Sequence, residues 1–346
     1  MKTTAAILVE TGKPLVLAEL DIPVLKDGQV LVEIRYSGAC HTQILEARGY
    51  RGEDRFLPHC LGHEASGTVV DIGAGVSKVR PGDNVVLSWI KGRGADVPGT
   101  VYKWDGRDVN AGGVTTFSRH AVVSENRLTP LPASLDLRVA IVLGCAAPTG
   151  MGAVMNVAAP KPGQSLAVFG TGGVGLFAIA AAAAEKCNPV IAIDRLANKL
   201  EMALEMGATH TINASEQDVT EALAEICPKG LDHAIEATGI PDVMAGALGA
   251  VRAQGGNCVI IGNAHHGQNL TVNPQQFNMG KSLLGTWGGN AQPDDDYPRF
   301  AALIASGQAR CGHILSDDYA LESINDALDD LEAGRIGRPV IDMKAA

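Results

Sequence analysis

The chain has 346 residues, more than a single hydrophobic core usually organises, so we expect two domains. Hydrophobic residues make up 46% of the chain, an ordinary share for a globular protein, and its 41 glycines indicate many tight turns and ligand sites lined by backbone. The formal net charge is −10 and no basic block is present, which argues against a nucleic-acid partner.

The first residues, MKTTAAILVETGKPL, contain too short an apolar run for a secretory signal. The longest apolar stretch, GLFAIAAAAA, is too short to span a membrane, so we expect a cytoplasmic protein. The seven cysteines are scattered and odd in number, which does not match a disulfide framework. We therefore interpret them as buried thiols unless a specific role can be assigned. They are Cys40, Cys60, Cys145, Cys187, Cys227, Cys258 and Cys311.

Two patterns follow each other along the chain. From residue 1 to about residue 140, short alternating runs such as QVLVEIRYSG, SGTVVDIG and DNVVLSWI predict antiparallel strands in a barrel or sandwich. From about residue 164, apolar strands alternate with helical segments, beginning with SLAVFG, GVGLFAIAAAAAEK and PVIAID. This alternation predicts a doubly wound parallel sheet, so the fold class is α/β. Near the C-terminus, YPRFAALIASGQ and ESINDALDDLEAG predict amphipathic helices.

A glycine-rich turn joins the first strand of the second pattern to the helix that follows. Gly170-Thr171-Gly172-Gly173-Val174-Gly175 fits G-x-G-x-x-G, in which the glycines permit a tight turn, close approach of a pyrophosphate and close packing of helix on strand. The next strand ends in Asp194, near the spacing of roughly 20 residues expected for an acid that binds the adenosine ribose. Dinucleotide binding therefore explains the segment better than a purely structural turn.

Asp194 also bears on the choice of cofactor. A carboxylate accepts hydrogen bonds from ribose hydroxyls and repels a 2′-phosphate, which favours NAD over NADP. Arg195 follows immediately and could pair with such a phosphate. Lys199 on the next helix could reach the ribose, or simply face solvent.

Cys40 and His41 stand side by side at the end of a predicted strand, and more metal-binding residue types follow. His63 and Glu64 lie in HCLGHEASG, and Cys145 lies in LGCAAPTG. No C-x-x-C pair exists, so a structural zinc site built from such pairs is not predicted, but a catalytic zinc needs only three ligands and an open position. Spacing alone leaves open whether these residues bind a metal or are ordinary core residues.

Four motifs in order, GACHTQ, GHEASGTVVDIGAGVSKVRPGDNVV, LGCAAPTGMGAV and VFGTGGVGL, resemble the zinc-dependent alcohol dehydrogenases of the medium-chain dehydrogenase/reductase family. The resemblance covers essentially the whole chain. It implies a GroES-like catalytic domain of residues 1–147 and 288–346, and a Rossmann domain of residues 148–287. The implied enzyme transfers a hydride between an alcohol, or its aldehyde or ketone, and NAD(H), with one catalytic zinc per chain, in a homodimer or homotetramer.

The resemblance assigns roles to individual positions. Cys40, His63 and Cys145 are the implied zinc ligands, Glu64 is a carboxylate able to approach the metal, and Thr42 takes the alcohol proton. The implied cofactor contacts are His41 and Arg338 for the phosphates, the turn from Gly170 to Gly175, Asp194, Arg195 and Lys199, then Thr149, Ile261 and Gly262 around the nicotinamide. Trp89 corresponds to an aromatic that lines the substrate pocket. His59 and Cys60 match no ligand.

Three departures from the family pattern matter. The stretch of residues 88–118, where relatives with a structural zinc carry four cysteines, has none, so we expect no structural zinc and a lobe held by other contacts. Gln43 replaces a common Asp; its carboxamide can accept a hydrogen bond from the ligand His but brings no charge, so we expect a weaker hold on zinc. Leu45 replaces a relay His, so the proton is expected to leave through water.

Two alternatives stay open on the sequence alone. One is a zinc-free reductase of the same fold that acts on enones or quinones, against which the three filled ligand positions argue. The other is a non-catalytic nucleotide-binding protein, which would need no metal ligands.

Overall fold

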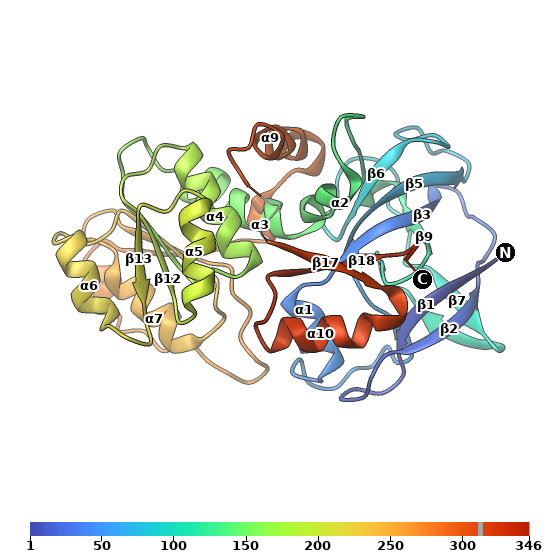
Figure 1. The fold of residues 1–346 in the computed structure, drawn as a ribbon, viewed down its shortest axis with the longest axis horizontal. Helices are drawn as coiled ribbons and strands as arrows, with labels where there is room; N and C mark the ends of the chain where they lie inside the picture. The colour runs from blue at the N-terminus through green and yellow to red at the C-terminus, as the bar shows by residue number, and fades with distance from the viewer. Residues whose placement is uncertain (311–313, 346) are drawn as a thin grey trace. The chain divides into compact units, whose positions relative to one another are not determined.

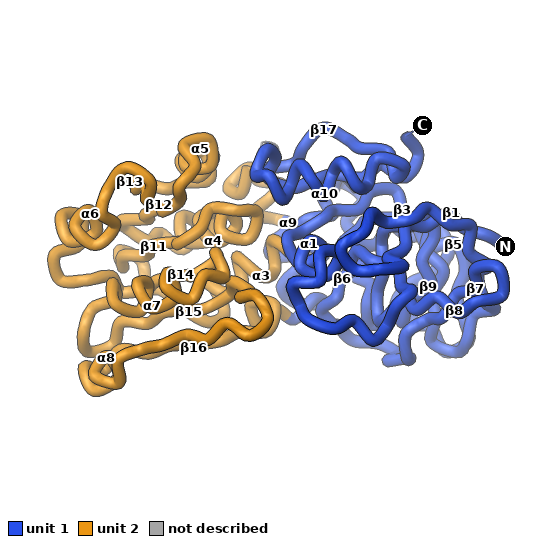
Figure 2. The backbone as a smooth tube through the Cα atoms, turned by 90° about the horizontal axis from the view of Figure 1, so that it is seen from below, with its two compact units in different colours: residues 1–145, 292–301, 312–346 blue, residues 146–291, 302–311 orange. Residues whose placement is uncertain are grey.

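A computed structural model describes residues 1–310 and 314–345 of the protein, so Cys311 lies outside the described part. The chain divides into two compact units, coloured separately in Figure 2. Unit 1 comprises Met1–Cys145, Gln292–Ala301 and the described residues of 312–346. Unit 2 comprises Ala146–Ala291 and the described residues of 302–311.

Unit 1 is built from β-strands, as the alternating pattern predicts (Figure 1). Its described strands form a closed barrel in the order β1 (Lys2–Leu8), β2 (Val16–Asp21), β7 (Val101–Trp104), β8 (Arg107–Asn110) and β4 (His59–Cys60). A second sheet has the order β10 (Leu128–Pro130), β6 (Asn84–Ser88), β5 (Glu64–Ile72), β3 (Gln29–Gly38), β18 (Arg338–Asp342) and β17 (Leu315–Ala320), and β9 (His120–Ser124) also pairs with β3. Most pairs are antiparallel, but β4 with β8 and β17 with β18 are parallel.

Some strands bury one face and others bury both: β6 and β9 are buried along most of their length, whereas β2 alternates. In β2, for example, Ala18 and Leu20 are buried while the residues between and around them are exposed. The helices of this unit are α1 (His41–Ala47), α2 (Leu137–Ala140) and α10 (Ile324–Glu332), with single 3₁₀ turns at η1 (Glu125–Arg127), η2 (Ile141–Gly144) and η5 (Leu321–Ser323). Helix α9 (Pro293–Ala305) contains residues of both units.

Unit 2 contains a parallel sheet with the strand order of a Rossmann fold. The described order is β13 (His210–Asn213), β12 (Val190–Asp194), β11 (Leu166–Phe169), β14 (His233–Glu236), β15 (Asn257–Ile260) and β16 (Ser282–Gly285), and every pair is parallel. The first strand, LAVF, is buried along its whole length, which explains its continuous apolar sequence. The predicted doubly wound sheet is therefore confirmed.

Helices follow the strands of unit 2 in the predicted alternation. They are α4 (Gly173–Ala184), α5 (Ala197–Glu205), α6 (Val219–Ile226), α7 (Pro241–Ala250) and the short α8 (Gln275–Asn278), preceded by α3 (Ala146–Gly152) with its π-helical continuation η3 (Ala153–Ala158), and η4 (Gly288–Asn290) follows β16. Local capping sets some boundaries: the Asp218 side chain accepts a hydrogen bond from the Glu221 backbone N–H at 2.9 Å and so begins α6.

No single helix of the described residues is long and apolar enough to cross a membrane. The segments Leu137–Gly144 and Ala146–Ala158 meet the criteria of length and composition only when they are taken together as one bent pair.

The lobe of residues 90–115 is held by strand pairing and by a buried carboxylate. Strands β7 and β8 form a hairpin that pairs with β2 on one side and β4 on the other, which closes the barrel. Glu125 is 1% exposed, and its carboxylate accepts hydrogen bonds from the backbone N–H groups of Ser77 and Lys78, both at 2.6 Å, and of Ala95 at 2.8 Å. Strand pairing therefore holds this lobe together with the Glu125 carboxylate, which accepts hydrogen bonds from Ala95 within the lobe and from residues 77–78 outside it.

Candidate metal centre and cofactor site

Three ligand-type side chains come together in unit 1 because adjacent strands bring their chain segments to one place. Cys40 follows β3 and is the N-cap of α1, and His63 immediately precedes β5. Strands β3 and β5 are antiparallel with Ser37 opposite Ala65, so the end of β3 lies beside the beginning of β5. Cys145 follows η2, whose residue Gly144 lies against Glu64.

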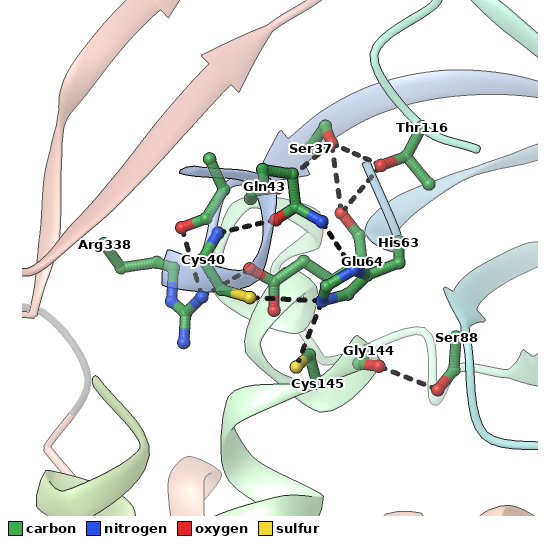
Figure 3. A network of polar contacts seen from close by, with 12 residues as sticks. Ser37, Cys40, Gln43, His63, Glu64, Ser88, Thr116, Gly144, Cys145 and Arg338 are labelled. Atoms are coloured by element: carbon green, nitrogen blue, oxygen red, sulfur yellow. Dashed lines mark hydrogen bonds and ion pairs between the residues drawn. The ribbon is translucent and has the colours of Figure 1, made fainter. Parts of the chain in front are cut away.

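The ligand atoms of Cys40, His63 and Cys145 lie within 4.8 Å of one another. The His63 Nε2 atom is 3.3 Å from the Cys40 Sγ atom and 3.3 Å from the Cys145 Sγ atom, as Figure 3 shows. Both cysteines are buried, at 8% and 7% exposure.

These distances fit a tetrahedral zinc. With Zn–S near 2.3 Å and Zn–N near 2.05 Å, tetrahedral angles place N and S about 3.6 Å apart, so the side chains would need to separate by a few tenths of an ångström. Two thiolates and one imidazole leave one position open, which is the arrangement of a catalytic rather than a structural zinc site. The structure thus brings the three predicted ligands together.

Two glycines shape the space around Glu64, which is fully buried behind the cluster. A Cβ atom on Gly38 would lie 2.6 Å from the Glu64 Oε1 atom, and a Cβ atom on Gly144 would lie 2.6 Å from the Glu64 Cβ atom. Gly144 immediately precedes Cys145, and Gly38 stands two residues before Cys40. Sequence reasoning did not assign these glycines a role, although their recurrence before Cys40 and Cys145 is the signal that could have indicated it.

Arg338 lies beside this cluster and pairs with Glu64. Its Nη1 atom donates to the Glu64 Oε1 atom at 2.7 Å and to the Ala39 carbonyl at 3.1 Å, and the residue is 2% exposed. Burial opposes the charge, but the carboxylate of Glu64 and the nearby Cys40 raise the pKa of Arg338, so it stays protonated. The buried carboxylate of Glu64 thus has a buried countercharge in Arg338. The predicted contact of Arg338 with the cofactor phosphates stays a prediction.

One of the two cysteines is disposed to ionise. A hydrogen bond from the Cys145 thiol lowers the pKa of the Cys40 thiol well below its ordinary value; burial opposes this lowering, and His63 and Arg338 reinforce it. The same hydrogen bond, together with burial, raises the pKa of Cys145. The thiolate of Cys40 is the form that binds metals.

Gln43 contacts two parts of the cluster. Its Oε1 atom accepts a hydrogen bond from the Cys40 backbone N–H at 2.9 Å, and its Nε2 atom lies 2.6 Å from the His63 Nδ1 atom. Contrary to the prediction from the sequence, the carboxamide oxygen therefore does not face the ligand His, because it already accepts the backbone N–H of the helix N-cap.

Helix α1 carries the other predicted residues of this region and is braced by α10, which lies beside it in Figure 1. Arg48 at the C-cap of α1 donates to the Glu332 carboxylate of α10 at 2.9 Å. His41 is exposed and Thr42 half-buried in the first turn of α1. Trp89 follows β6, and its carbonyl accepts a hydrogen bond from Arg127.

In unit 2, the glycine-rich turn and Asp194 form one hydrogen-bonded group. The Asp194 Oδ2 atom accepts from the Thr171 backbone N–H at 2.8 Å and from the Thr171 hydroxyl at 3.0 Å. Gly172 is the N-cap of α4, and a Cβ atom added there would have no described heavy atom within 4 Å. A Cβ atom on Gly175 would lie 1.9 Å from the Gly170 carbonyl oxygen. Gly175 therefore allows the close packing of helix on strand that the motif predicts, while the approach of a pyrophosphate to Gly172 stays a prediction.

The remaining cofactor predictions fall on several elements of unit 2. Lys199 lies on α5 and Thr149 on α3, while Arg195 follows β12, with its backbone N–H donating to Asp194 at 2.8 Å. Ile261 and Gly262 follow β15.

A buried glutamate that sequence reasoning missed organises the loop around Gly262. The Glu236 side chain is 0% exposed, and its Oε1 atom accepts from the backbone N–H groups of Thr238 at 2.6 Å and Gly239 at 3.0 Å. The Glu236 backbone carbonyl accepts from the Ile261 N–H at 2.9 Å. An acid at the end of an apolar strand, followed by Thr and Gly, is the signal that could have indicated this role.

Comparisons with known proteins agree with this architecture. Residues 26–133 match the family model for an alcohol dehydrogenase GroES-like domain, and residues 173–306 match the model for a zinc-binding dehydrogenase. An S-(hydroxymethyl)glutathione dehydrogenase from a Synechocystis species is 33% identical, over 99% of this chain and 100% of its own. A protein of the same description from an Escherichia coli strain is also 33% identical over the same shares.

Solved structures show the same fold. A crystal structure of an alcohol dehydrogenase zinc-binding domain protein from Burkholderia ambifaria superposes with a TM-score of 0.92 at 29% identity and covers 100% of both chains. Benzyl alcohol dehydrogenase from Acinetobacter calcoaceticus superposes with a TM-score of 0.90 at 28% identity over 99% of both chains. These matches, the two-unit fold and the cysteine–histidine–cysteine cluster together identify the chain as a member of the zinc-dependent alcohol dehydrogenases of the medium-chain dehydrogenase/reductase family.

Proposed function

We propose that this oxidoreductase uses NAD to oxidise a primary alcohol, and NADH to reduce the corresponding aldehyde, at one catalytic zinc held by Cys40, His63 and Cys145. The observation that carries the proposal is the buried cysteine–histidine–cysteine cluster with ligand atoms within 4.8 Å. Two relatives act, by their names, on S-(hydroxymethyl)glutathione and on benzyl alcohol. Both substrates carry a CH₂OH group, which supports a primary alcohol as the substrate class.

Residues around the proposed zinc site have different roles in the reaction. A bound zinc would supply a Lewis acid that favours the ionised form of an alcohol and polarises a carbonyl. The Thr42 hydroxyl would accept the alcohol proton. Leu45 is buried and has no group to pass the proton on, so the proton would leave to water. The buried pair of Glu64 and Arg338 keeps a fixed charge distribution behind the ligands.

Asp194 supports NAD as the cofactor. Its carboxylate is held by Thr171 and by the backbone N–H groups of Arg195 and Leu196, at 2.8 and 3.1 Å. This fixed negative charge accepts hydrogen bonds from ribose hydroxyls and repels a 2′-phosphate. The phosphates would lie against the N-terminus of α4, where Gly172 leaves the backbone open.

The two domains have separate roles in this proposed function. Residues 1–147 and 288–346 act as the catalytic domain, and residues 148–287 act as the cofactor domain. The protein works in the cytoplasm as a homodimer or homotetramer, and light scattering of the purified protein measures this state directly.

Zinc content and NADH formation, measured on the same preparations, test the function. We expect about one zinc per chain, and NADH formation from primary alcohols with NAD that is faster than with NADP. Cys40→Ser is expected to lose both zinc and activity. Cys60→Ser is the matched control, because Cys60 is also buried and burial raises the pKa of its thiol to about 12, so the thiol stays protonated. This variant should retain both zinc and activity. An active enzyme without zinc would contradict the proposal in favour of a zinc-free reductase.

A further inference from the structure

Gln43 has two hydrogen-bonding partners that compete for the two ends of its carboxamide. It is the third residue of α1 and completes a capping box with Cys40, in which the Gln43 Oε1 atom accepts the Cys40 backbone N–H at 2.9 Å. Its Nε2 atom then faces the His63 Nδ1 atom at 2.6 Å. Gln43 is 1% exposed, so water is not a ready substitute for either partner.

The chemistry of the donors decides which end faces which partner. A backbone N–H can only donate, so the carboxamide oxygen must face Cys40, and the NH₂ group must face the ring. At 2.6 Å, an N–H group on the His63 Nδ1 atom would point directly at this NH₂ group. The ring therefore accepts at Nδ1 and carries its proton on Nε2, where it donates to the sulfur atoms 3.3 Å away. The whole network is satisfied in this one arrangement.

Zinc requires the opposite tautomer. A histidine that binds a metal through Nε2 carries its proton on Nδ1 and donates it to an acceptor. In this chain that acceptor is the same oxygen that caps α1. We infer that Gln43 is a positioning residue that sets zinc retention, because its carboxamide must rotate, and release or share the Cys40 N–H, before His63 can bind the metal. The inference rests on the proposed zinc site.

A side chain of the same size with two acceptor oxygens removes the conflict. In Gln43→Glu, one oxygen continues to cap α1 while the other accepts a proton on the His63 Nδ1 atom. Because changes in the hydrogen-bond partners of metal ligands typically alter metal affinity by about 10- to 100-fold, we expect Gln43→Glu to bind zinc at least about tenfold more tightly. Gln292→Glu adds the same charge to unit 1 at an exposed position and should leave zinc affinity unchanged.

The experiment measures zinc affinity by competition with a chromophoric chelator, and the tautomer of His63 by ¹⁵N NMR of the zinc-free protein. We expect the proton on Nε2 in the wild type and on Nδ1 in Gln43→Glu, with signals assigned from His63→Ala. Equal zinc affinity in the wild type and Gln43→Glu, or a wild-type ring protonated on Nδ1, would overturn the inference. Absence of zinc binding in both proteins would instead overturn the zinc site itself, so the two failures are distinguishable.

Discussion

Replacing Glu125 with Gln tests how the lobe of residues 90–115 is held. The carboxylate accepts three backbone hydrogen bonds from two separate segments, at 2.6, 2.6 and 2.8 Å. In Glu125→Gln, an NH₂ group replaces one oxygen and faces a backbone donor, so at least one charged hydrogen bond is lost at about 1.5–3 kcal/mol and the others weaken. We expect a loss of about 3 kcal/mol in the free energy of unfolding of unit 1.

Differential scanning calorimetry checks this prediction. For a unit of this size, 1 kcal/mol corresponds to roughly 2–4 °C, so the Tm of the unit 1 transition should fall by about 6–12 °C at pH 7. The control is Glu53→Gln, whose side chain is 79% exposed, and it should change Tm by less than about 1 °C. An unchanged Tm in Glu125→Gln would refute the role of this carboxylate.

The same variant gives a pH dependence with a definite sign. Burial opposes ionisation of Glu125, but the three backbone N–H groups outweigh it and lower its pKa. A carboxylate with a lowered folded-state pKa contributes stability above its unfolded pKa of about 4.3, and this stability is lost as the pH falls through the folded-state value. The Tm difference between wild type and Glu125→Gln should therefore be full at pH 7 and shrink below about pH 4. A difference that is constant with pH would contradict the assignment.

The cofactor turn supports three further predictions. Gly172→Ala should leave Tm nearly unchanged, because the new Cβ meets no described atom within 4 Å. The same Cβ would lie where the pyrophosphate is expected, so a fluorescence titration should show NADH binding weakened by about tenfold or more. Gly175→Ala should lower the free energy of unfolding of unit 2 by more than about 2 kcal/mol, because its Cβ would lie 1.9 Å from the Gly170 carbonyl oxygen. Calorimetry measures this loss, and an unchanged transition would refute the predicted clash. Asp194→Ala should raise the ratio of kcat/KM for NADP over NAD, and an unchanged ratio would show that this carboxylate does not select the cofactor.

Local patterns in the sequence determined the secondary structure and the cofactor motif. Alternation predicted the strands of unit 1, strand–helix alternation predicted the parallel sheet, and the spacing from Gly170 to Asp194 predicted the dinucleotide site. These features depend on residues close to one another in the chain, where backbone sterics and side-chain periodicity act directly. Family resemblance then assigned the three zinc ligands, which spacing alone left open.

The tertiary structure alone decided which way the polar groups around those ligands point. Cys40 and His63 meet because β3 and β5 pair in one register, and Cys145 joins them through packing of η2 against the sheet that contains β5. The oxygen of Gln43 caps α1, and the buried Glu64 draws the Arg338 guanidinium inward. The cap itself is local, but the contact of Gln43 with His63 and that of Glu64 with Arg338 join groups far apart in the sequence, so the fold determines which donors and acceptors pair there.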